Sequence, residues 1–222
     1  MAYGIGIEVW GDRALFSRPE LSVERMSYDC VTPSAARGIL ESVYWHPGMT
    51  YRIDSIAVLN PIHFSTIRIN EVKSKALASA MKTSIVNKGP LPYINAKQDI
   101  QQRTTTYLTN VRYVIKAHFD LIPDKMEEDD SEGKFISIIR RRLAKGQCFR
   151  QPYLGISEFP ASFKLFDEED SLRGSYSDVE EKDLGLMLYD MDYSDHSDIT
   201  PMFFRAIMRY GIIDVAGSEV LR

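Results

Sequence analysis

The sequence has few cysteines and no long apolar run. Its 222 residues include two cysteines, Cys30 and Cys148, and neither lies in a CxxC or mixed Cys/His spacing. A disulfide framework and a zinc site are therefore not indicated, and we expect both residues to be buried thiols. No segment approaches the roughly 20 apolar residues of a membrane span, and the N-terminus lacks the residue order of a signal peptide. We expect a cytoplasmic protein that does not enter a membrane.

The common catalytic signatures are missing as well. The sequence has no Walker loop, GxGxxG, HExxH or GxSxG motif, which argues against the usual nucleotide-binding, metalloprotease and hydrolase classes. The four histidines, His46, His63, His118 and His196, lie far apart in the sequence. We therefore predict no local metal cluster and no cofactor.

Positive and negative charges are unevenly distributed along the chain. The formal net charge is −4, yet residues 1–123 hold 14 Lys and Arg against 10 Asp and Glu, and residues 133–157 hold 6 against none. Acidic residues are concentrated in 124–132 and 158–198. An acidic protein can thus present a basic face to nucleic acid, although solvated loops and a solvated helix face would give the same pattern.

Apolar periodicity predicts the order strand, helix, strand, strand, helix, strand. The strands are expected at residues 3–10, 49–60, about 104–121 and 148–157, and the helices begin at Thr32–Pro33 and at Ser131 or Glu132. This order predicts an α+β, ferredoxin-like (RRM-like) βαββαβ domain over residues 1–158. Short apolar segments in 159–222 predict a small antiparallel β appendage packed on it, with a hairpin turn at Tyr210–Gly211.

Residues 73–102 form a basic excursion between two predicted strands. The segment holds five lysines, glycine and proline, and a short helical patch at about 76–81. We expect it to be poorly ordered until a partner binds.

The segment from Val111 to Leu121 alternates with a period of two. Every second residue from Val111 is apolar, while Lys116 and His118 fall on the other side. Same-face neighbours on a strand are roughly 6.5 Å apart, so an ammonium and an imidazole there can reach one phosphate. A surface histidine without a function is the alternative.

Lys116 and His118 are suited to RNA cleavage without a metal ion. A histidine can transfer a proton near neutral pH, and a lysine can stabilise the charge of the phosphorane. Tyr44 could supply a third polar group if the end of the first helix packs beside this strand. An amphipathic tyrosine at the edge of the core is the other interpretation of Tyr44.

Several other residues are candidate RNA contacts. Aromatic and guanidinium groups stack on unpaired bases and basic groups bind phosphates, which suggests Trp45, His46, Arg112, Arg140 and Arg141. Trp45 could equally lie in the core, and the arginine run could be a solvated helix face.

Four ordered segments resemble one protein family. The segments GIGIEVWGDRALFSRPE, PSAARGILESVYWHP, YRIDSIAVLNPI and YVIKAHFD are similar to the CRISPR-associated Cas-five family in its subtype I-C form, variant d. The resemblance covers about residues 3–160 and implies ferredoxin-like domains, in agreement with the predicted order of elements.

The resemblance also implies a function and a catalytic set. Variant d members cut precursor CRISPR RNA at the base of each repeat hairpin without metal and stay on the 5′ handle inside the interference complex. Their catalytic residues correspond to Tyr44, Lys116 and His118 of this sequence. We expect attack by a 2′-hydroxyl and a cyclic phosphate product.

The expected partners follow from the same resemblance. They are CRISPR repeat RNA, the other subunits of a type I-C complex and, through the basic excursion, duplex DNA. Other members of the family bind the handle without cutting it, so a non-catalytic RNA-binding subunit is the alternative function.

Overall fold

The chain folds into a nine-stranded antiparallel sheet with helices packed against it. The computed structural model describes residues 4–21, 24–167, 172–195 and 198–222; Tyr3, at the start of the first predicted strand, lies outside them. The strands are β1 (Ile5–Ala14), β2 (Met49–Val58), β3 (Phe64–Val72), β4 (Ile100–Leu121), β5 (Ser162–Leu165), β6 (Lys182–Asp192), β7 (Thr200–Arg209), β8 (Ile212–Asp214) and β9 (Val220–Leu221), and the helices are α1 (Pro33–Val43), α2 (Ala78–Val86) and α3 (Glu132–Lys145), with a short 3₁₀ helix at Pro123–Lys125.

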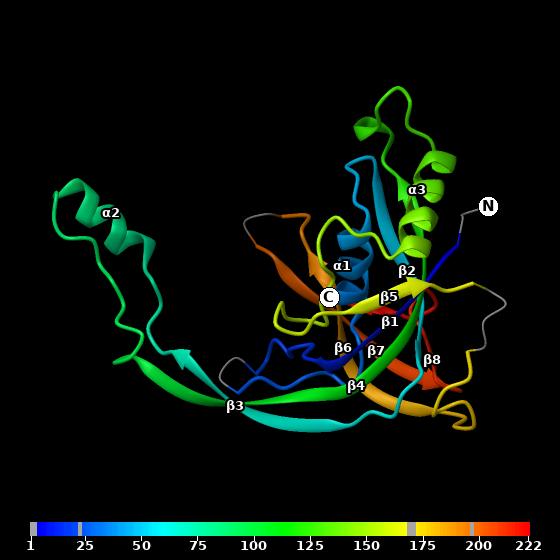
Figure 1. Cartoon of the computed structure of the whole chain (residues 1–222), viewed down its shortest axis with the longest axis horizontal. Coiled ribbons are helices and arrows are strands. Elements are labelled where there is room, and N and C mark those ends of the chain that lie inside the picture. Colours follow the sequence, from blue (N-terminus) through cyan, green and yellow to red (C-terminus); the bar gives the residue numbers. More distant parts are fainter. Residues whose placement is uncertain (1–3, 22–23, 168–171, 196–197) are drawn as a thin grey trace.

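The sheet has the strand order β5-β1-β4-β2-β8-β7-β6, while β3 pairs with β4 and β9 with β7. All of these pairings are antiparallel. Strands β1 and β4 are therefore central in the first half of the sheet, and α1 and α3 lie together on one side of them (Figure 1).

Helix α1 begins where the sequence predicts. The Thr32 side chain accepts a hydrogen bond from the backbone N–H of Ala35 at 3.2 Å, and Pro33 occupies the first helical position. The helix ends at Val43, and Tyr44, expected at the end of the helix, is the residue that follows it and has extended backbone angles. The Tyr51 hydroxyl donates to the Tyr44 carbonyl at 2.9 Å, which anchors this exit from the helix.

Helix α3 also begins where the sequence predicts. The Ser131 side chain accepts from the Lys134 backbone N–H, and Gly146 closes the helix in the left-handed region at φ 63°. Phe135, Ile139 and Leu143 are buried against the sheet, as the helical spacing indicates.

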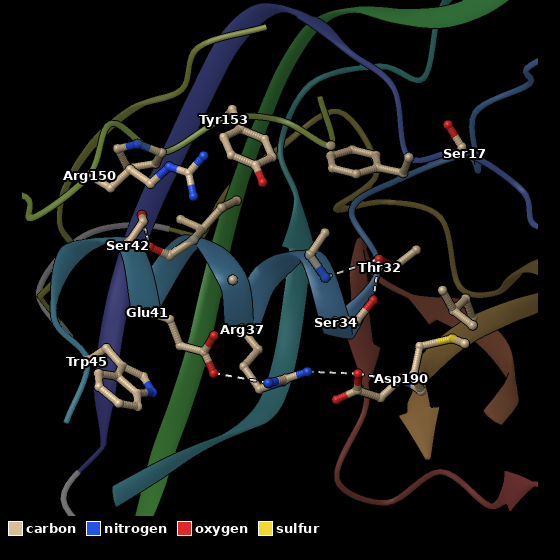
Figure 2. A pocket seen from close by; sticks show the side chains of 18 of the residues that line it. Ser17, Thr32, Ser34, Arg37, Glu41, Ser42, Trp45, Arg150, Tyr153 and Asp190 are labelled. Atoms are coloured by element: carbon tan, nitrogen blue, oxygen red, sulfur yellow. Dashed lines mark hydrogen bonds and ion pairs between the residues drawn. The ribbon is translucent and has the colours of Figure 1, made fainter. Parts of the chain in front are cut away.

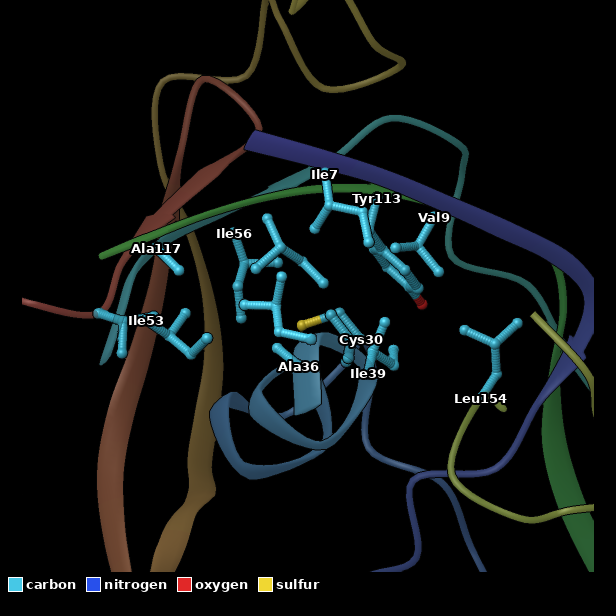
Figure 3. Close-up of a cluster of buried hydrophobic side chains, with 14 of the residues drawn as sticks. Ile7, Val9, Cys30, Ala36, Ile39, Ile53, Ile56, Tyr113, Ala117 and Leu154 are labelled. Atoms are coloured by element: carbon cyan, nitrogen blue, oxygen red, sulfur yellow. The ribbon is translucent and has the colours of Figure 1, made fainter. Parts of the chain in front are cut away.

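The main core lies between the sheet and α1 (Figure 3). Ile7 and Val9 of β1 and Tyr113 of β4 point toward Ile39 of α1 and toward Cys30. Cys30 is fully buried, as predicted, and burial raises the pKa of its thiol. Cys148 is only partly buried, so the expectation of a second buried thiol is not met in full.

The prediction of a fourth strand at residues 148–157 is wrong. This segment forms bends and turns. The strand that pairs with β1 on the edge away from β4 is β5. The turns have a steric reason: Gly155 has φ +90°, and a Cβ there would lie 1.9 Å from the Leu15 carbonyl oxygen. Leu154 is fully buried and its carbonyl accepts from the Leu15 N–H, so this segment is a packed loop rather than a strand.

The C-terminal strands extend the same sheet. Strand β8 pairs with β2, and β7 and β6 follow outward from it. The predicted hairpin turn is confirmed, with Tyr210 at φ 50° and Gly211 at φ 82° between β7 and β8.

A long arm projects from the body of the molecule (Figure 1). It consists of β3, the first part of β4, and residues 73–99 with α2 at the tip. Helix α2 ends five residues later than the predicted patch, and none of its residues is buried. Among the described helices, none is long and apolar enough to cross a membrane.

Candidate functional site

Lys116 and His118 lie on the face of the sheet that the helices leave open. On β4, Ile115, Ala117 and Phe119 are buried toward α1 and α3, and the two polar side chains between them are partly exposed on the other side. The predicted alternation of this strand is thus confirmed. We call the side that carries Lys116 and His118 the outer face.

An acidic residue of β2 lies beside this pair, at a bulge. Arg52 lies opposite His118 and Ser55 lies opposite Lys116, so Asp54 is one residue in excess in the register. The Asp54 carbonyl accepts the backbone N–H groups of Val215 and Ala216 at 2.9 and 3.0 Å. The chain that follows β8 therefore holds the bulge in place.

The Asp54 carboxylate contacts the imidazole of His118. Asp54 Oδ1 lies 2.6 Å from His118 Nδ1, and because a carboxylate only accepts, Nδ1 carries the proton. Nε2 lies 4.0 Å from Asp120 Oδ1, beyond hydrogen-bonding distance, and Asp120 instead accepts from Arg52 Nε at 3.0 Å. The nitrogen of His118 that faces away from Asp54 is therefore the one available for proton transfer.

Lys116 lies beside a segment that covers the middle of the outer face. It is opposite Gly6 on β1, where a Cβ would lie 2.6 Å from the Phe166 carbonyl oxygen. Phe166 is buried and packs with Val114, Ala57 and Leu59. Gly6 thus allows Phe166 to approach β1 closely. Val114 lies between polar residues of β4, but it is covered by Phe166 and is not exposed to water.

Tyr44 lies on the other side of the sheet. Its ring is 6.2 Å from that of Phe135, which is also 6.2 Å from Phe119. Since Phe119 and His118 point to opposite sides of β4, the Tyr44 ring is on the helix-covered face. Lys116 and His118 are brought together, and Tyr44 does not join them. Burial, followed by the negative charge of Asp130, raises the pKa of Tyr44, so its hydroxyl stays protonated at neutral pH.

Tyr44 lines a large cavity beside α1, which Figure 2 shows. The cavity has a volume of about 820 Å³, and its lining includes Trp45, Arg142, Arg150 and Tyr153. Trp45 is 60% exposed and therefore is not a core residue. The guanidinium of Arg142 lies 5.1 Å from the centre of the Tyr44 ring and donates to the Val43 carbonyl at 2.6 Å. Aromatic and cationic groups are thus combined in one concave surface, which suits an RNA strand.

A smaller cavity continues the first around the edge of the sheet. It has a volume of about 140 Å³, shares Arg37, Asp190 and Tyr193 with the larger one, and extends to Arg52. Strand β8 pairs with β2 only from Ser55 to Ala57, so the part of β2 before the bulge has an open edge here. This cavity therefore reaches Arg52, the residue opposite His118 in the sheet.

His46 occupies a structural junction near the start of α3. Its ring packs on Phe135 at 4.9 Å, Nδ1 accepts the Gly48 N–H at 3.1 Å, and Nε2 is 3.6 Å from Asp130 Oδ2. Both ring nitrogens thus face groups of the protein itself.

The remaining predicted contacts lie on two surfaces. Arg112 is on the outer face and pairs with Glu8, whereas Arg140 and Arg141 are exposed on α3. His196 lies outside the described residues. Within the part of the chain that the structure describes, no group of three or more His, Cys, Asp or Glu side chains is placed to hold a metal ion.

Sequence reasoning missed four residues of these sites: Asp54, Arg142, Arg150 and Tyr153. Asp54 carries a weak signal, since an acidic residue interrupts the apolar pattern of YRIDSIAV. The other three come from a helix face and a loop, and no local pattern assigns them to one cavity.

Comparison with known sequences identifies the family. Residues 4–216 match the model of the family described as CRISPR-associated protein (Cas_Cas5), and the chain belongs to this family. A protein of Mannheimia succiniciproducens named CRISPR pre-crRNA endoribonuclease Cas5d is 45% identical over 218 residues, which cover 97% of this chain and 96% of that protein. A protein of Thermus thermophilus with the same name is 35% identical over 231 residues, covering 96% and 91%.

Solved structures share the fold. A crystal structure of a CRISPR-associated protein has a TM-score of 0.72 at 23% identity and covers 100% of this chain and 97% of its own. A chain of a CRISPR RNA-guided surveillance complex has a TM-score of 0.50 at 10% identity and covers 99% and 89%.

Proposed function

We propose that this protein is an endoribonuclease that cuts CRISPR repeat RNA at the base of its hairpin and stays on the 5′ handle as a subunit of a type I-C interference complex. The names of the two relatives support the activity, because 45% and 35% identity extend over nearly the whole chain. The shared fold with a chain of an RNA-guided surveillance complex supports the assembly.

The proposed reaction is a metal-independent transesterification. The 2′-oxygen bonds to phosphorus, the bond to the 5′-oxygen breaks, one proton leaves the 2′-hydroxyl and one reaches the 5′-oxygen. The products are a 2′,3′-cyclic phosphate and a 5′-hydroxyl. His118 transfers one of these protons through Nε2, and Lys116 stabilises the negative charge of the phosphorane.

One observation carries this assignment: the 2.6 Å contact of Asp54 Oδ1 with His118 Nδ1. An acidic partner fixes the orientation and tautomer of the imidazole and leaves Nε2 for the substrate. A surface histidine without a function needs no such partner on a β-bulge.

Tyr44 has a positioning role in this proposal. The RNA lies in the cavity of Trp45 and Arg142, passes the open edge of β2 at Arg52 and reaches His118 on the outer face. The two cavities support this path, because they share three lining residues and the smaller one is lined by Arg52, which is opposite His118.

We also propose that the fold is ferredoxin-like. The order β1, α1, β2, β4, α3, β5 along the chain and the spatial order β5-β1-β4-β2 support it. Strand β5 lies in the proposed second part, residues 159–222, but pairs with β1 of the first part. The boundary of the first domain therefore moves from residue 158 to the end of β5.

The test is incubation of the purified protein with a labelled hairpin repeat in EDTA. Wild-type protein is expected to cut, and His118→Ala to cut about 10²- to 10⁴-fold more slowly with its RNA affinity retained. His63→Ala is the matched control, because His63 is exposed and lies just before β3, where its carbonyl accepts the backbone N–H of Thr109, nine residues before His118 on β4.

A substrate variant and an analysis of the product make the test of mechanism sharper. Hydrogen in place of the 2′-hydroxyl at the scissile nucleotide should abolish cutting and spare binding, and mass spectrometry should find the cyclic phosphate. Undiminished cleavage of the deoxy substrate would rule out the mechanism. Tight binding without any product, together with weaker binding by Lys116 and His118 variants, would support the non-catalytic subunit instead.

We further propose that the arm contacts duplex DNA in the assembled complex. Residues 73–99 carry five lysines against one aspartate, and the side chains of all five lysines are exposed. Glutamine in place of these lysines should weaken binding of duplex DNA by the complex and reduce its salt dependence. An unchanged salt dependence would contradict the proposal.

A further inference from the structure

The outer face has a second concave site at the opposite end of β1 and β4 from His118. A cavity of about 500 Å³ opens there, lined by Trp10, Glu8, Arg112, Lys164, Asp12 and the pair Asn60 and Asn110. Its volume is in the range of small-ligand pockets. The covered middle of the face, around Val114 and Phe166, separates this cavity from Lys116.

Trp10 supplies an accessible aromatic surface in this cavity. It lies opposite Arg112 on one side and Ser162 on the other, in the middle of three paired strands, and is 36% exposed. A tryptophan on a sheet face would normally be covered by packing or stack on a ligand, because its large apolar ring is costly to leave in water.

The charges in the cavity compensate each other. Glu8 is only 4% exposed; its Oε1 accepts from Arg112 Nε at 2.5 Å and its Oε2 from Lys164 Nζ at 3.1 Å. The carboxylates of Glu8 and Asp12 balance the cations of Arg112 and Lys164, so the formal charge of the lining is zero. The cavity is therefore a poor site for a phosphate and a better one for an uncharged group that stacks.

Polar groups at the rim are held in fixed positions. Asn60 Nδ2 donates to the Asn110 carbonyl oxygen at 2.8 Å and to Asn110 Oδ1 at 3.2 Å. Asn110 itself has a left-handed backbone at φ 50°. Amide and carboxylate groups beside an aromatic ring are the set that reads the edge of a flipped-out base.

We infer that this cavity binds an unpaired nucleobase of the repeat RNA, stacked on Trp10, with the amide and carboxylate groups of the rim at its edge. The inference rests on the proposed function, because it assigns a second contact to the same RNA. The outer face would then hold the RNA at both ends, at the scissile phosphate by His118 and at one flanking base by Trp10.

Tryptophan fluorescence can test the stacking directly. The chain has two tryptophans, so Trp45→Phe, which keeps an aromatic ring in the RNA-binding cavity, leaves Trp10 as the single tryptophan reporter, and the titration is carried to RNA concentrations that saturate this variant. Titration with repeat RNA that carries its unpaired flanks should quench the emission of Trp10. The hairpin stem alone should not, and equal quenching by both RNAs would overturn the inference.

An abasic scan of the flanks identifies the base. With wild-type protein, one abasic position should weaken binding about 10-fold, which is typical of a lost base–aromatic stack. With Trp10→Ala the same position should have no further effect, and Trp10→Phe should recover part of the affinity. Because the lining is neutral, Trp10→Ala should leave the salt dependence of binding unchanged.

The control is Leu186→Ala, an exposed apolar residue on β6 that is 56% exposed. It should behave as wild type in every assay. If wild-type protein neither binds nor cuts the repeat, the proposed function fails. If it binds and cuts but no abasic position couples to Trp10, the base-binding cavity fails and the proposed function stands.

Discussion

The carboxylate of Asp54 lies 2.6 Å from the imidazole of His118, across the pairing of β2 with β4. Asp54 is two residues from Arg52 and so faces the same side of β2 as Arg52 and His118, and the bulge leaves it without a partner residue of its own on β4. The outer face thus carries an imidazole that an acidic residue of the neighbouring strand orients.

The first prediction concerns this contact. Asp54→Ala should lower the single-turnover rate of RNA cleavage about 10- to 100-fold, because the imidazole loses its orientation and tautomer, while RNA affinity stays within about twofold. Asp120→Ala is the control, since Asp120 pairs with Arg52 and lies 4.0 Å from His118. Equal effects of the two variants on the rate would contradict the assigned role of Asp54.

The second prediction separates the arginines of α3. Arg142→Ala should lower the free energy of unfolding by about 1–2 kcal/mol, because it removes the contact with the Tyr44 ring and a charged hydrogen bond to Val43. It should also weaken RNA binding. Arg141→Ala should leave stability unchanged, because its side chain is exposed. Denaturant unfolding and filter binding of both variants check this.

The third prediction compares two glycines of the N-terminal segment. Gly6→Ala should destabilise the protein by about 1–3 kcal/mol, because its Cβ would lie 2.6 Å from the Phe166 carbonyl oxygen. Gly4→Ala meets nothing within 4 Å and should change stability by less than about 0.5 kcal/mol. Equal midpoints of denaturation for the two variants would show that Phe166 does not lie against β1.

The fourth prediction concerns pH and Asp130. The pKa of this carboxyl lies below 3.8, chiefly because it accepts the Glu127 backbone N–H, then because Lys134 donates to it and His46 is near. A depressed pKa in the folded state means that the carboxylate contributes stability above its ordinary pKa, and this contribution is lost as the pH falls through the lowered value.

Asp130→Asn should therefore melt at a lower temperature than wild type at neutral pH. The difference should narrow below about pH 4, where wild type loses the same contribution. Glu128→Gln, an acidic position in the same loop, should follow wild type throughout. A difference in melting temperature that does not depend on pH would argue against the charge of Asp130 as its cause.

Much of the fold follows from local patterns in the sequence. The caps at Thr32, Ser131 and Gly146, the alternation of β4 and the turn at Tyr210 are set by residues close to each other, and each is predictable. Strand β5 lies among the short apolar segments expected to form the β appendage, but its place beside β1 is not predicted, because four residues are too few to indicate a partner strand. Gly155 turns the chain in the segment predicted for that place.

The site is harder to predict because it depends on contacts between distant residues. Lys116 and His118 share a strand, so their common face is predictable. Asp54, which contacts His118, lies at a bulge of β2. The bulge is formed by the pairing of β2 with β4 and by hydrogen bonds from the chain after β8. The sequence suggests Tyr44 beside Lys116, but the packing of its ring on Phe135 places it on the opposite face.

The arm and the outer face are parts of one strand, since β4 runs from Ile100 to Leu121, with the left-handed residue Asn110 between the two parts. At about 3.3 Å per residue, the length of β4 is roughly 70 Å. Adding two residues to both β3 and β4 within the arm would lengthen its reach and keep every side chain on its present side. Adding one residue to each would rotate the tip to the other side relative to His118. The reach of the arm can therefore be engineered only in steps of two residues.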